Sequence, residues 1–144
     1  MLKALSLGGY ALMMGGLLGL VLYRALFSSA LLVIALQIFA FAVFIWARIT
    51  FGRRSFHLAA NPTEGGLVTT GPYRFIRHPI YAALCLFTWA GLVAHWSWKA
   101  GLFGLLILAG SLLRIFCEEK LISARYPEYK QYALGTWRMI PYVF

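Results

Sequence analysis

Hydrophobic residues run through this chain in four long stretches, with short polar breaks between most of them. A helix needs about 20 mostly apolar residues to cross a lipid bilayer, and each stretch approaches that length. The pattern therefore predicts an all-α fold, an integral membrane helical bundle of about four transmembrane helices. The expected spans are residues 4–23, 27–47, 79–98 and 100–116.

The polar breaks define the expected topology of this bundle. Residues 24–26 and 98–99 form turns so short that the spans they join should pack as antiparallel neighbours. Residues 48–78 form the one long polar segment. The first span is expected to be retained rather than cleaved as a signal peptide, because a second apolar run follows it at once. We therefore expect one domain over residues 1–144, which opens with a helical hairpin over residues 1–47.

Composition and charge agree with a membrane protein. The chain is 62% hydrophobic and 12% charged, whereas ordinary soluble domains are about 25% charged. Only Arg24 and Lys99, of the 13 Lys and Arg residues, flank one side of the four spans. By the positive-inside rule, both termini and the long polar segment then face the cytoplasm. The basic residues on that side are Lys3, Arg48, Arg53, Arg54, Arg74, Arg77, Arg114, Lys120, Arg125, Lys130 and Arg138.

A net charge of +9 raises the question of nucleic acid. The basic residues are better explained as topology signals that contact anionic lipid headgroups, because no basic stripe with interleaved aromatic residues lies outside the membrane flanks. Gly15 and Gly19 have a GxxxG spacing in an apolar helix, which favours close helix packing rather than dinucleotide binding. Cys85 and Cys117 belong to no CxxC or Cys/His cluster, so no metal site is expected.

One arginine lies inside the last apolar stretch, where a charge is costly and asks for a reason. Arg114 stands four residues before Glu118, so the two side chains share one helical face and can pair. Glu119 lies about 100° further round the helix, which favours a separate role. Arg114 and Glu118 are either an interfacial ion pair, with the arginine extending toward the headgroups, or part of a site.

The segment GPYRFIRHPIYAAL, residues 71–84, gathers charge and rigid turns before an apolar run. It opens with a glycine–proline turn, and Pro79 favours the first turn of a helix. His78 precedes this helix start, with Arg77 and Tyr81 close by. Unpaired backbone N–H groups there suit an anionic ligand. The alternative is an interfacial anchor, with cations on headgroups and tyrosines in the aromatic belt.

Four motifs follow one another in the second half of the chain: LVTTGPYRFIRHPIYAAL, RIFCEEKLI, YPEYKQY and MIPYV. Together they resemble the signature of the isoprenylcysteine carboxyl methyltransferase family. That signature has a Gly-x-Tyr turn, Arg-His-Pro-x-Tyr, an arginine four residues before a Glu-Glu pair, Tyr-x-x-Tyr and a late Ile-Pro. Residues 67–143 are thus the family-matching catalytic half. The chain departs from the family at Tyr126-Pro127, where Phe-Gly is frequent, and it is shorter than eukaryotic members.

The resemblance implies an integral membrane methyltransferase that uses S-adenosyl-L-methionine in a pocket facing the cytosol, with a short cytosolic helix near the C-terminus. It implies a lipid-like or prenylated acceptor, and the short chain indicates the inner membrane of a bacterium or archaeon. By motif position, Arg114 and Glu118 would be catalytic, where acceptor and methyl group meet. The implied cofactor-binding residues are Arg77, His78, Tyr81, Glu119, Tyr129 and Tyr132.

The chemistry of the acceptor and two rival functions stay open. A carboxylate acceptor needs no base, and Arg114 would hold it by a forked pair of hydrogen bonds. An amine or thiol needs a base, for which Glu118 is the candidate. One rival is an NADPH-dependent membrane reductase of the sterol or steroid type. The other is a non-catalytic membrane scaffold or a small transporter subunit. Transport predicts polar residues at mid-membrane depth, and the span interiors offer few apart from Gln37 and Thr88.

Overall fold

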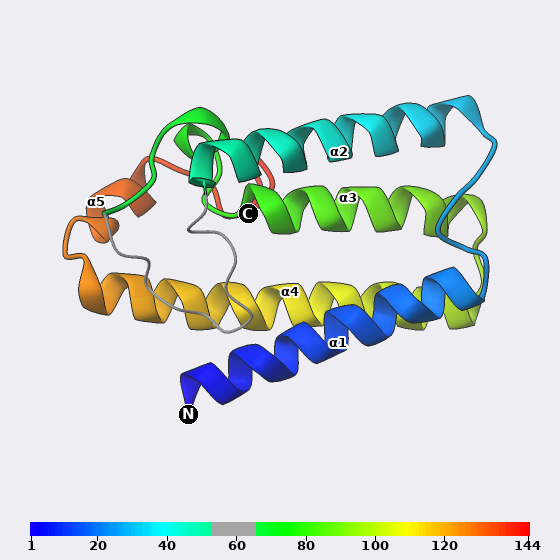
Figure 1. Ribbon diagram of the computed structural model, residues 1–144, viewed down its shortest axis with the longest axis horizontal. Helices are drawn as coiled ribbons and strands as arrows, with labels where there is room; N and C mark the ends of the chain where they lie inside the picture. Colours follow the sequence, from blue (N-terminus) through cyan, green and yellow to red (C-terminus); the bar gives the residue numbers. More distant parts are fainter. Residues whose placement is uncertain (53–65) are drawn as a thin grey trace.

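The computed structural model describes residues 1–52 and 66–144, so Arg53 and Arg54 of the expected cytoplasmic charges lie outside the described residues. Within these ranges the chain is helical, and its one extended pairing is an isolated bridge between Ile76 and Trp137. The elements are α1 (Leu2–Leu22), α2 (Leu31–Phe51), the 3-10 turn η2 (Gly71–Arg74), α3 (Pro79–Ala94), α4 (Trp98–Arg125) and α5 (Tyr129–Leu134) (Figure 1).

The expectation of an all-helical integral membrane protein is confirmed, because α1, α2 and α4 are each long and apolar enough to span a bilayer. The third expected span, which corresponds to α3, is apolar but has only 16 residues. It is therefore about 24 Å long, whereas a hydrocarbon core is about 30 Å thick. The 28 residues of α4 reach about 42 Å, so its last turns extend past the hydrocarbon.

Several expected boundaries were wrong. The connection between α1 and α2 covers residues 23–30 rather than 24–26. Helix α2 begins at Leu31 rather than at Phe27, so residues 27–30 belong to the connection. The third span ends at Ala94 rather than at residue 98. Helix α4 begins at Trp98, and the side chain of its N-cap residue, Ser97, accepts a hydrogen bond from the Ala100 N–H. Helix α4 also continues nine residues beyond the expected end at 116, since its charged last turns stay helical.

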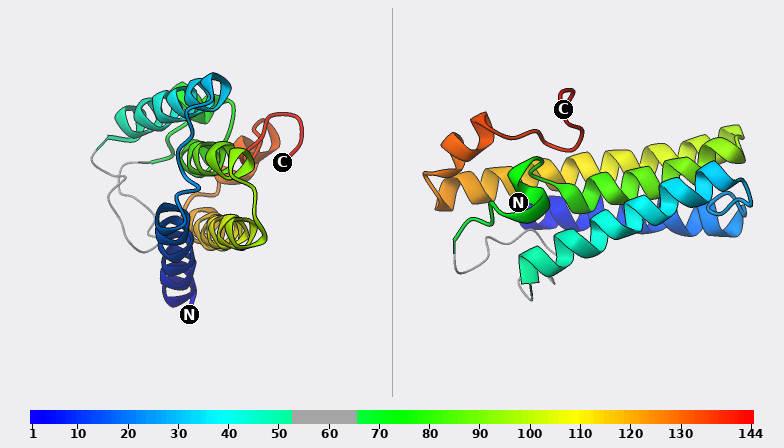
Figure 2. Two further views of the ribbon diagram at one scale, coloured as in Figure 1. Left: turned by 90° about the vertical axis from the view of Figure 1, so that its right-hand side faces the viewer. Right: turned by 90° about the horizontal axis from the view of Figure 1, so that it is seen from above.

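The four long helices pack as two pairs, α1 along α4 and α2 along α3, and α3 joins the pairs through α4 (Figures 1 and 2). Small residues allow α1 to approach α4 closely. A Cβ added at Gly16 would lie 2.6 Å from the Phe103 carbonyl oxygen, whereas one at Gly15 would meet nothing within 4 Å. Close packing of α1 is therefore confirmed, but Gly16, rather than the expected Gly15, faces α4 together with Gly19.

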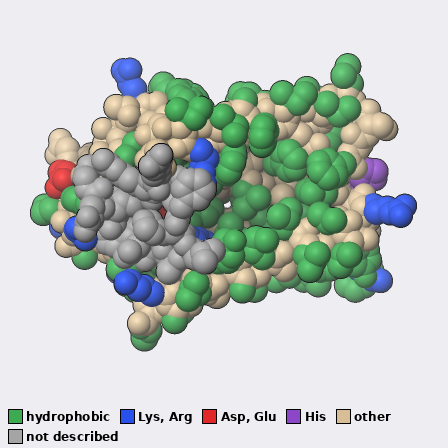
Figure 3. All heavy atoms as spheres, in the orientation of Figure 1, with side chains coloured by type: hydrophobic (Ala, Val, Ile, Leu, Met, Phe, Trp, Pro, Cys, Tyr) green, Lys and Arg blue, Asp and Glu red, His purple; other side chains and the backbone are tan. Residues whose placement is uncertain are grey.

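The polar residues inside the spans serve the packing of the bundle. Gln37 of α2 is buried and donates hydrogen bonds to the carbonyl oxygens of Leu26, at 2.7 Å, and Phe87, at 3.2 Å. Thr88 donates to carbonyl oxygens of its own helix. The outer surface is hydrophobic through the middle of the face in Figure 3, and Lys and Arg side chains gather toward its two ends.

Candidate functional site

The start of α3 is shaped by the turn that precedes it. Gly71 has φ 57°, a conformation that favours glycine. A Cβ there would also meet the side chain of Thr50 at the end of α2. The turn continues as η2, and Tyr73 packs its ring against Phe51, with 5.4 Å between ring centroids. His78 is the N-cap residue of α3, and Pro79 follows in its first turn, as expected from the sequence.

The C-terminal tail pairs with the segment before α3. The N–H of Arg77 donates to the Trp137 carbonyl at 2.7 Å, and that of His78 donates to the Arg138 carbonyl at 2.9 Å. In return, the N–H of Trp137 donates to the Phe75 carbonyl at 3.1 Å. This short parallel pairing brings a second arginine, Arg138, to the mouth of α3.

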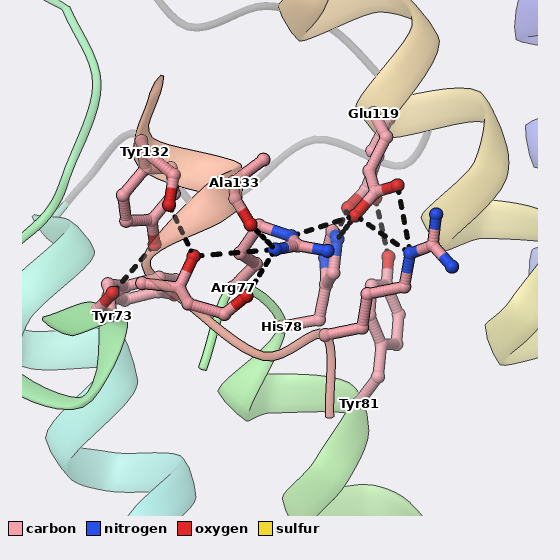
Figure 4. A network of polar contacts seen from close by, with 10 residues as sticks. Tyr73, Arg77, His78, Tyr81, Glu119, Tyr132 and Ala133 are labelled. Atoms are coloured by element: carbon pink, nitrogen blue, oxygen red, sulfur yellow. Dashed lines mark hydrogen bonds and ion pairs between the residues drawn. The ribbon is translucent and has the colours of Figure 1, made fainter. Parts of the chain in front are cut away.

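Glu119 of α4 is the centre of a cluster of positive partners (Figure 4). Its Oε1 accepts from Arg77 Nε at 3.1 Å and lies 3.3 Å from His78 Nε2. Its Oε2 accepts from Arg138 Nε at 3.1 Å. The side chains of Arg77 and His78 are only 10% and 6% exposed, whereas that of Arg138 is 43% exposed. The carboxylate therefore joins a buried pair of residues to one that solutes can reach.

Arg77 also anchors the tail. Its Nη1 donates to the carbonyl oxygens of Ala133, at 2.7 Å, and Thr136. These contacts run from the segment before α3 to the end of α5 and beyond it (Figure 4). The guanidinium thus connects three parts of the chain that are distant in sequence, including α4 through Glu119.

Arg114, Tyr81 and Glu118 form a second polar group one turn deeper in the bundle. Arg114 Nε donates to the Tyr81 hydroxyl at 2.7 Å, and that hydroxyl donates to Glu118 Oε1 at 2.5 Å. Arg114 Nη2 also donates to Glu118 Oε1 at 3.3 Å. The side chain of Arg114 is 7% exposed and that of Glu118 is 22% exposed. We name this set the Arg–Tyr–Glu relay.

His78 stands between the two groups. Its Nδ1 lies 3.7 Å from Glu118 Oε2 and its Nε2 lies 3.3 Å from Glu119 Oε1. The imidazole ring also lies against the Tyr81 ring, with 5.9 Å between centroids. The two neighbouring carboxylates thus have different arginine partners, and the His78 imidazole lies between them.

Helix α5 adds tyrosines beside Glu119. The hydroxyl of Tyr132 donates to the Tyr73 carbonyl at 2.7 Å, and burial raises the pKa of Tyr132 to about 12. Burial and, after it, the charge of Glu119 raise the pKa of Tyr129. The Tyr129 hydroxyl is buried and makes no hydrogen bond of normal geometry among the described residues, although the Glu119 carboxylate is close enough to raise its pKa. A buried donor in this state is unusual, and Glu119 and a bound ligand are its two candidate acceptors.

The structure brings together all the site residues expected from the sequence, at one end of the bundle. Sequence reasoning missed Arg138, Thr136 and two α1 groups beside Arg114, the Tyr10 ring and the Ser6 carbonyl. The late position of Arg138, two residues before Ile140-Pro141, was the available signal for it. Nothing local marked Tyr10, since its contact is with a residue more than a hundred positions away.

A cavity of about 450 Å³ adjoins η2, lined by the end of α2 (Thr50, Phe51, Gly52) and residues 67–70. It lies next to the turn that holds Tyr73 rather than against Glu118. Among the described residues, no three His, Cys, Asp or Glu side chains are arranged to hold a metal ion.

The fold and the site define a class: a helical integral membrane protein with a polar, ion-paired centre at one end of its bundle. Comparison with known families identifies it further. The family model for phospholipid methyltransferase matches residues 27–129. The chain therefore belongs to the phospholipid methyltransferase family, a family of membrane methyltransferases that includes the isoprenylcysteine carboxyl methyltransferase type.

A curated relative extends the comparison. The nickel-cobalt-cadmium resistance protein NccN of Alcaligenes xylosoxydans xylosoxydans is 36% identical to this chain over 78 residues. The matched part is 52% of this chain and 36% of NccN, so the chain spans about a third of that relative. No solved structure matches the chain.

Proposed function

We propose that this protein transfers a methyl group from S-adenosyl-L-methionine to a lipid-like acceptor. The observation that carries the proposal is the buried Arg–Tyr–Glu relay, which His78 joins to the Glu119 cluster at one end of a membrane bundle. Charged groups inside a membrane protein are costly and mark function by default. Membership of a methyltransferase family supplies the reaction class.

The residues of the site fit the cofactor chemically. S-adenosyl-L-methionine carries a sulfonium, an ammonium and a carboxylate, so it needs partners of both signs. Glu119 supplies a partly exposed carboxylate, and Arg138 supplies a guanidinium within reach of solution. The Tyr129 hydroxyl is a buried donor that makes no hydrogen bond of normal geometry among the described residues. We propose that His78, Tyr81 and Arg77 complete the part of the site that binds the cofactor. Arg77 contributes by holding α5 and the C-terminal tail in place.

When bound, the cofactor supplies a methyl group that its sulfonium has already activated, so the protein has to bind, orient and exclude water. The C-terminal tail and α5 cover the Glu119 side of the site, and the long helices of the bundle cover its other side. In-line transfer needs the reacting atoms about 3 to 3.5 Å apart, which rewards rigid side chains. The relay provides this rigidity, because Tyr81 and Glu118 fix the guanidinium of Arg114 from two helices.

The relay bears on the acceptor in two ways. Arg114 uses Nε and Nη2 within the protein, so a forked bond to an acceptor carboxylate requires Arg114 to exchange these partners. Glu118 Oε2 faces His78 Nδ1 at 3.7 Å, longer than a hydrogen bond, so it can accept a proton from an amine acceptor. We keep both acceptors, a carboxylate of isoprenylcysteine type and a lipid amine, because a single product assay separates them.

We further propose that the site end faces the cytoplasm of a bacterial or archaeal inner membrane. The start of α1, the last turns of α4 and α5 lie toward this end, and they carry Lys3, Lys120 and Lys130. Arg24 follows the end of α1, and Lys99 lies in the first turn of α4, at the opposite end of the bundle. This distribution agrees with the positive-inside rule. A polar cofactor would then enter from the cytosol and the acceptor from the lipid. The surrounding basic residues would contact anionic headgroups.

Calorimetric titration of the detergent-purified protein with S-adenosylhomocysteine, and separately with NADPH, tests the cofactor. We expect micromolar binding of the first and none of the second. His78→Ala should weaken this binding about tenfold or more, because it removes the imidazole between the two carboxylates. His95→Ala, an exposed histidine at the far end, is the matched control and should bind normally. Binding of NADPH alone would contradict the proposed function and would indicate a membrane reductase instead.

Transfer is then measured with methyl-labelled cofactor and total membrane lipid. Labelled lipid should appear with wild-type protein and not with Arg114→Met. Mild alkali releases the label as methanol from a methyl ester and leaves an N-methyl group intact, so it distinguishes a carboxylate acceptor from an amine. Tight cofactor binding with no labelled product from any lipid fraction would refute a lipid-like acceptor.

A further inference from the structure

Helix α1 supplies two contacts to Arg114. The Tyr10 ring lies under the guanidinium, with Cζ 5.5 Å from the ring centroid. Nη1 of Arg114 points to the Ser6 carbonyl oxygen at 3.5 Å, at the limit of a hydrogen bond. Tyr81 of α3 presents a second ring at 6.0 Å. The buried guanidinium is thus enclosed by residues of three helices, α1, α3 and α4.

The close approach of α1 depends on one glycine beside Tyr10. A Cβ added at Gly9 would lie 2.9 Å from the Gly110 carbonyl oxygen and 3.0 Å from Arg114 Cγ. The contact with the backbone oxygen is shorter than a Cβ accepts, and the one with Arg114 is tight, so a larger residue would push α1 away from α4 at the level of Arg114. The neighbouring Gly8 faces open space, with nothing within 4 Å of an added Cβ.

The region that matches the methyltransferase family begins at residue 27, after α1 has ended. Tyr10 and Ser6 therefore lie outside the family-matched region, yet they contact the one arginine buried in α4. In the relay, Tyr81 and Glu118 hold Nε and Nη2 of this arginine, while Nη1 points to Ser6 of α1.

We infer that Tyr10 is a positioning residue for methyl transfer, in which its ring face holds the Arg114 guanidinium in the orientation that the relay requires. The inference rests on the proposed function and deepens it, because it assigns α1 a part in the acceptor side of the site. A cation over an aromatic face is stabilised by the ring, more strongly where water is excluded. The hydroxyl of Tyr10 has no part in this contact, so the ring alone should suffice.

Kinetics of two substitutions at position 10 test the inference. Tyr10→Leu should lower kcat about tenfold, the size of a partly desolvated cation–π contact. Affinity for S-adenosylhomocysteine should stay unchanged, because the contact acts on the geometry of transfer rather than on cofactor binding. Tyr10→Phe keeps the ring and should retain wild-type kcat. An unchanged kcat in Tyr10→Leu, or an equal loss in Tyr10→Phe, would overturn the inference.

Glycine substitutions in α1 separate positioning from general packing. Gly9→Ala should reproduce the kcat loss of Tyr10→Leu, and Gly8→Ala, its matched control, should not. Gly16→Ala also clashes with α4, at the Phe103 carbonyl, but away from Arg114. It should lower the thermal midpoint while leaving kcat nearly unchanged. An equal kcat loss in Gly16→Ala would show that only packing matters and would contradict the inference.

A double-mutant cycle gives a readout that does not depend on activity. Thermal midpoints are measured for Tyr10→Leu, Arg114→Met and the double variant in detergent. If the ring holds the guanidinium, the shift caused by Tyr10→Leu should largely vanish in the Arg114→Met background. Additive shifts would refute the contact. A wild type that neither binds S-adenosylhomocysteine nor transfers a methyl group would instead refute the proposed function.

Discussion

Glu118 and Glu119 are adjacent in sequence and face different partners. Glu118 accepts hydrogen bonds from Tyr81 and Arg114, both buried within the bundle. Glu119 meets Arg77 and the more exposed Arg138. Successive helical residues point about 100° apart, so one step along α4 turns from the interior of the bundle to the tail.

This separation predicts two distinct variants. Glu119→Gln should weaken S-adenosylhomocysteine binding about tenfold or more, because it leaves neighbouring cations without their counter-charge. Glu118→Gln should bind S-adenosylhomocysteine normally and lower kcat about a hundredfold or more, the scale of a lost acid–base or orienting group. Exposed Glu128→Gln is the control. Calorimetry and the labelled-lipid assay measure both, and identical defects in the two variants would contradict separate roles.

Residue-level prediction succeeded where the chemistry is local. The pairing of Arg114 with Glu118 followed from their spacing on one helix and is confirmed at 3.3 Å. The helix start at Pro79 followed from its fixed backbone. The contacts of Arg138 and Tyr10 could not be predicted, since they depend on how a tail and a distant helix pack.

At the scale of elements, apolar length located the helices but not their ends. Hydropathy falls at Glu118 and Glu119, which predicted that the last span ends near residue 116. The backbone nevertheless stays helical to Arg125. The opposite error occurred at the start of α2. Residues 27–30 were expected to begin the second span, but they form a connection, and the helix begins at Leu31. That connection is held by the buried amide of Gln37, which donates to the Leu26 carbonyl.

Gln37 therefore predicts a stability effect. Gln37→Leu leaves the Leu26 carbonyl without this donor in an apolar setting, and should lower the free energy of unfolding by about 0.5 to 2 kcal/mol, as for hydrogen bonds between membrane helices. Ile38→Leu, on the exposed face of the same helix, should change little. Unfolding in detergent with increasing denaturant measures the difference. A Gln37→Leu variant as stable as the wild type would show that the hydrogen bond contributes nothing net.

Across the whole molecule, the polar centre lies at one end of an otherwise apolar bundle. Arg114 stands sixteen residues into α4, about 24 Å from its start, which equals the length of α3. The start of α3 and the buried arginine therefore lie at one level, and the last turns of α4 extend beyond it. This is why Tyr81, in the first turn of α3, contacts Arg114 rather than residues near the end of α4.

The shortness of α3 carries a consequence for the membrane itself. A helix about 6 Å shorter than the hydrocarbon forces nearby lipids to compress or the protein to tilt, at a cost that rises with mismatch. Transfer should therefore be faster in nanodiscs of lipids with about 14 carbons per acyl chain than with about 18. S-adenosylhomocysteine affinity, measured in both, is the control for an intact site. Equal rates would show that α3 imposes no local thinning, whereas the expected difference would make bilayer thickness a regulator of which membrane regions this protein can serve.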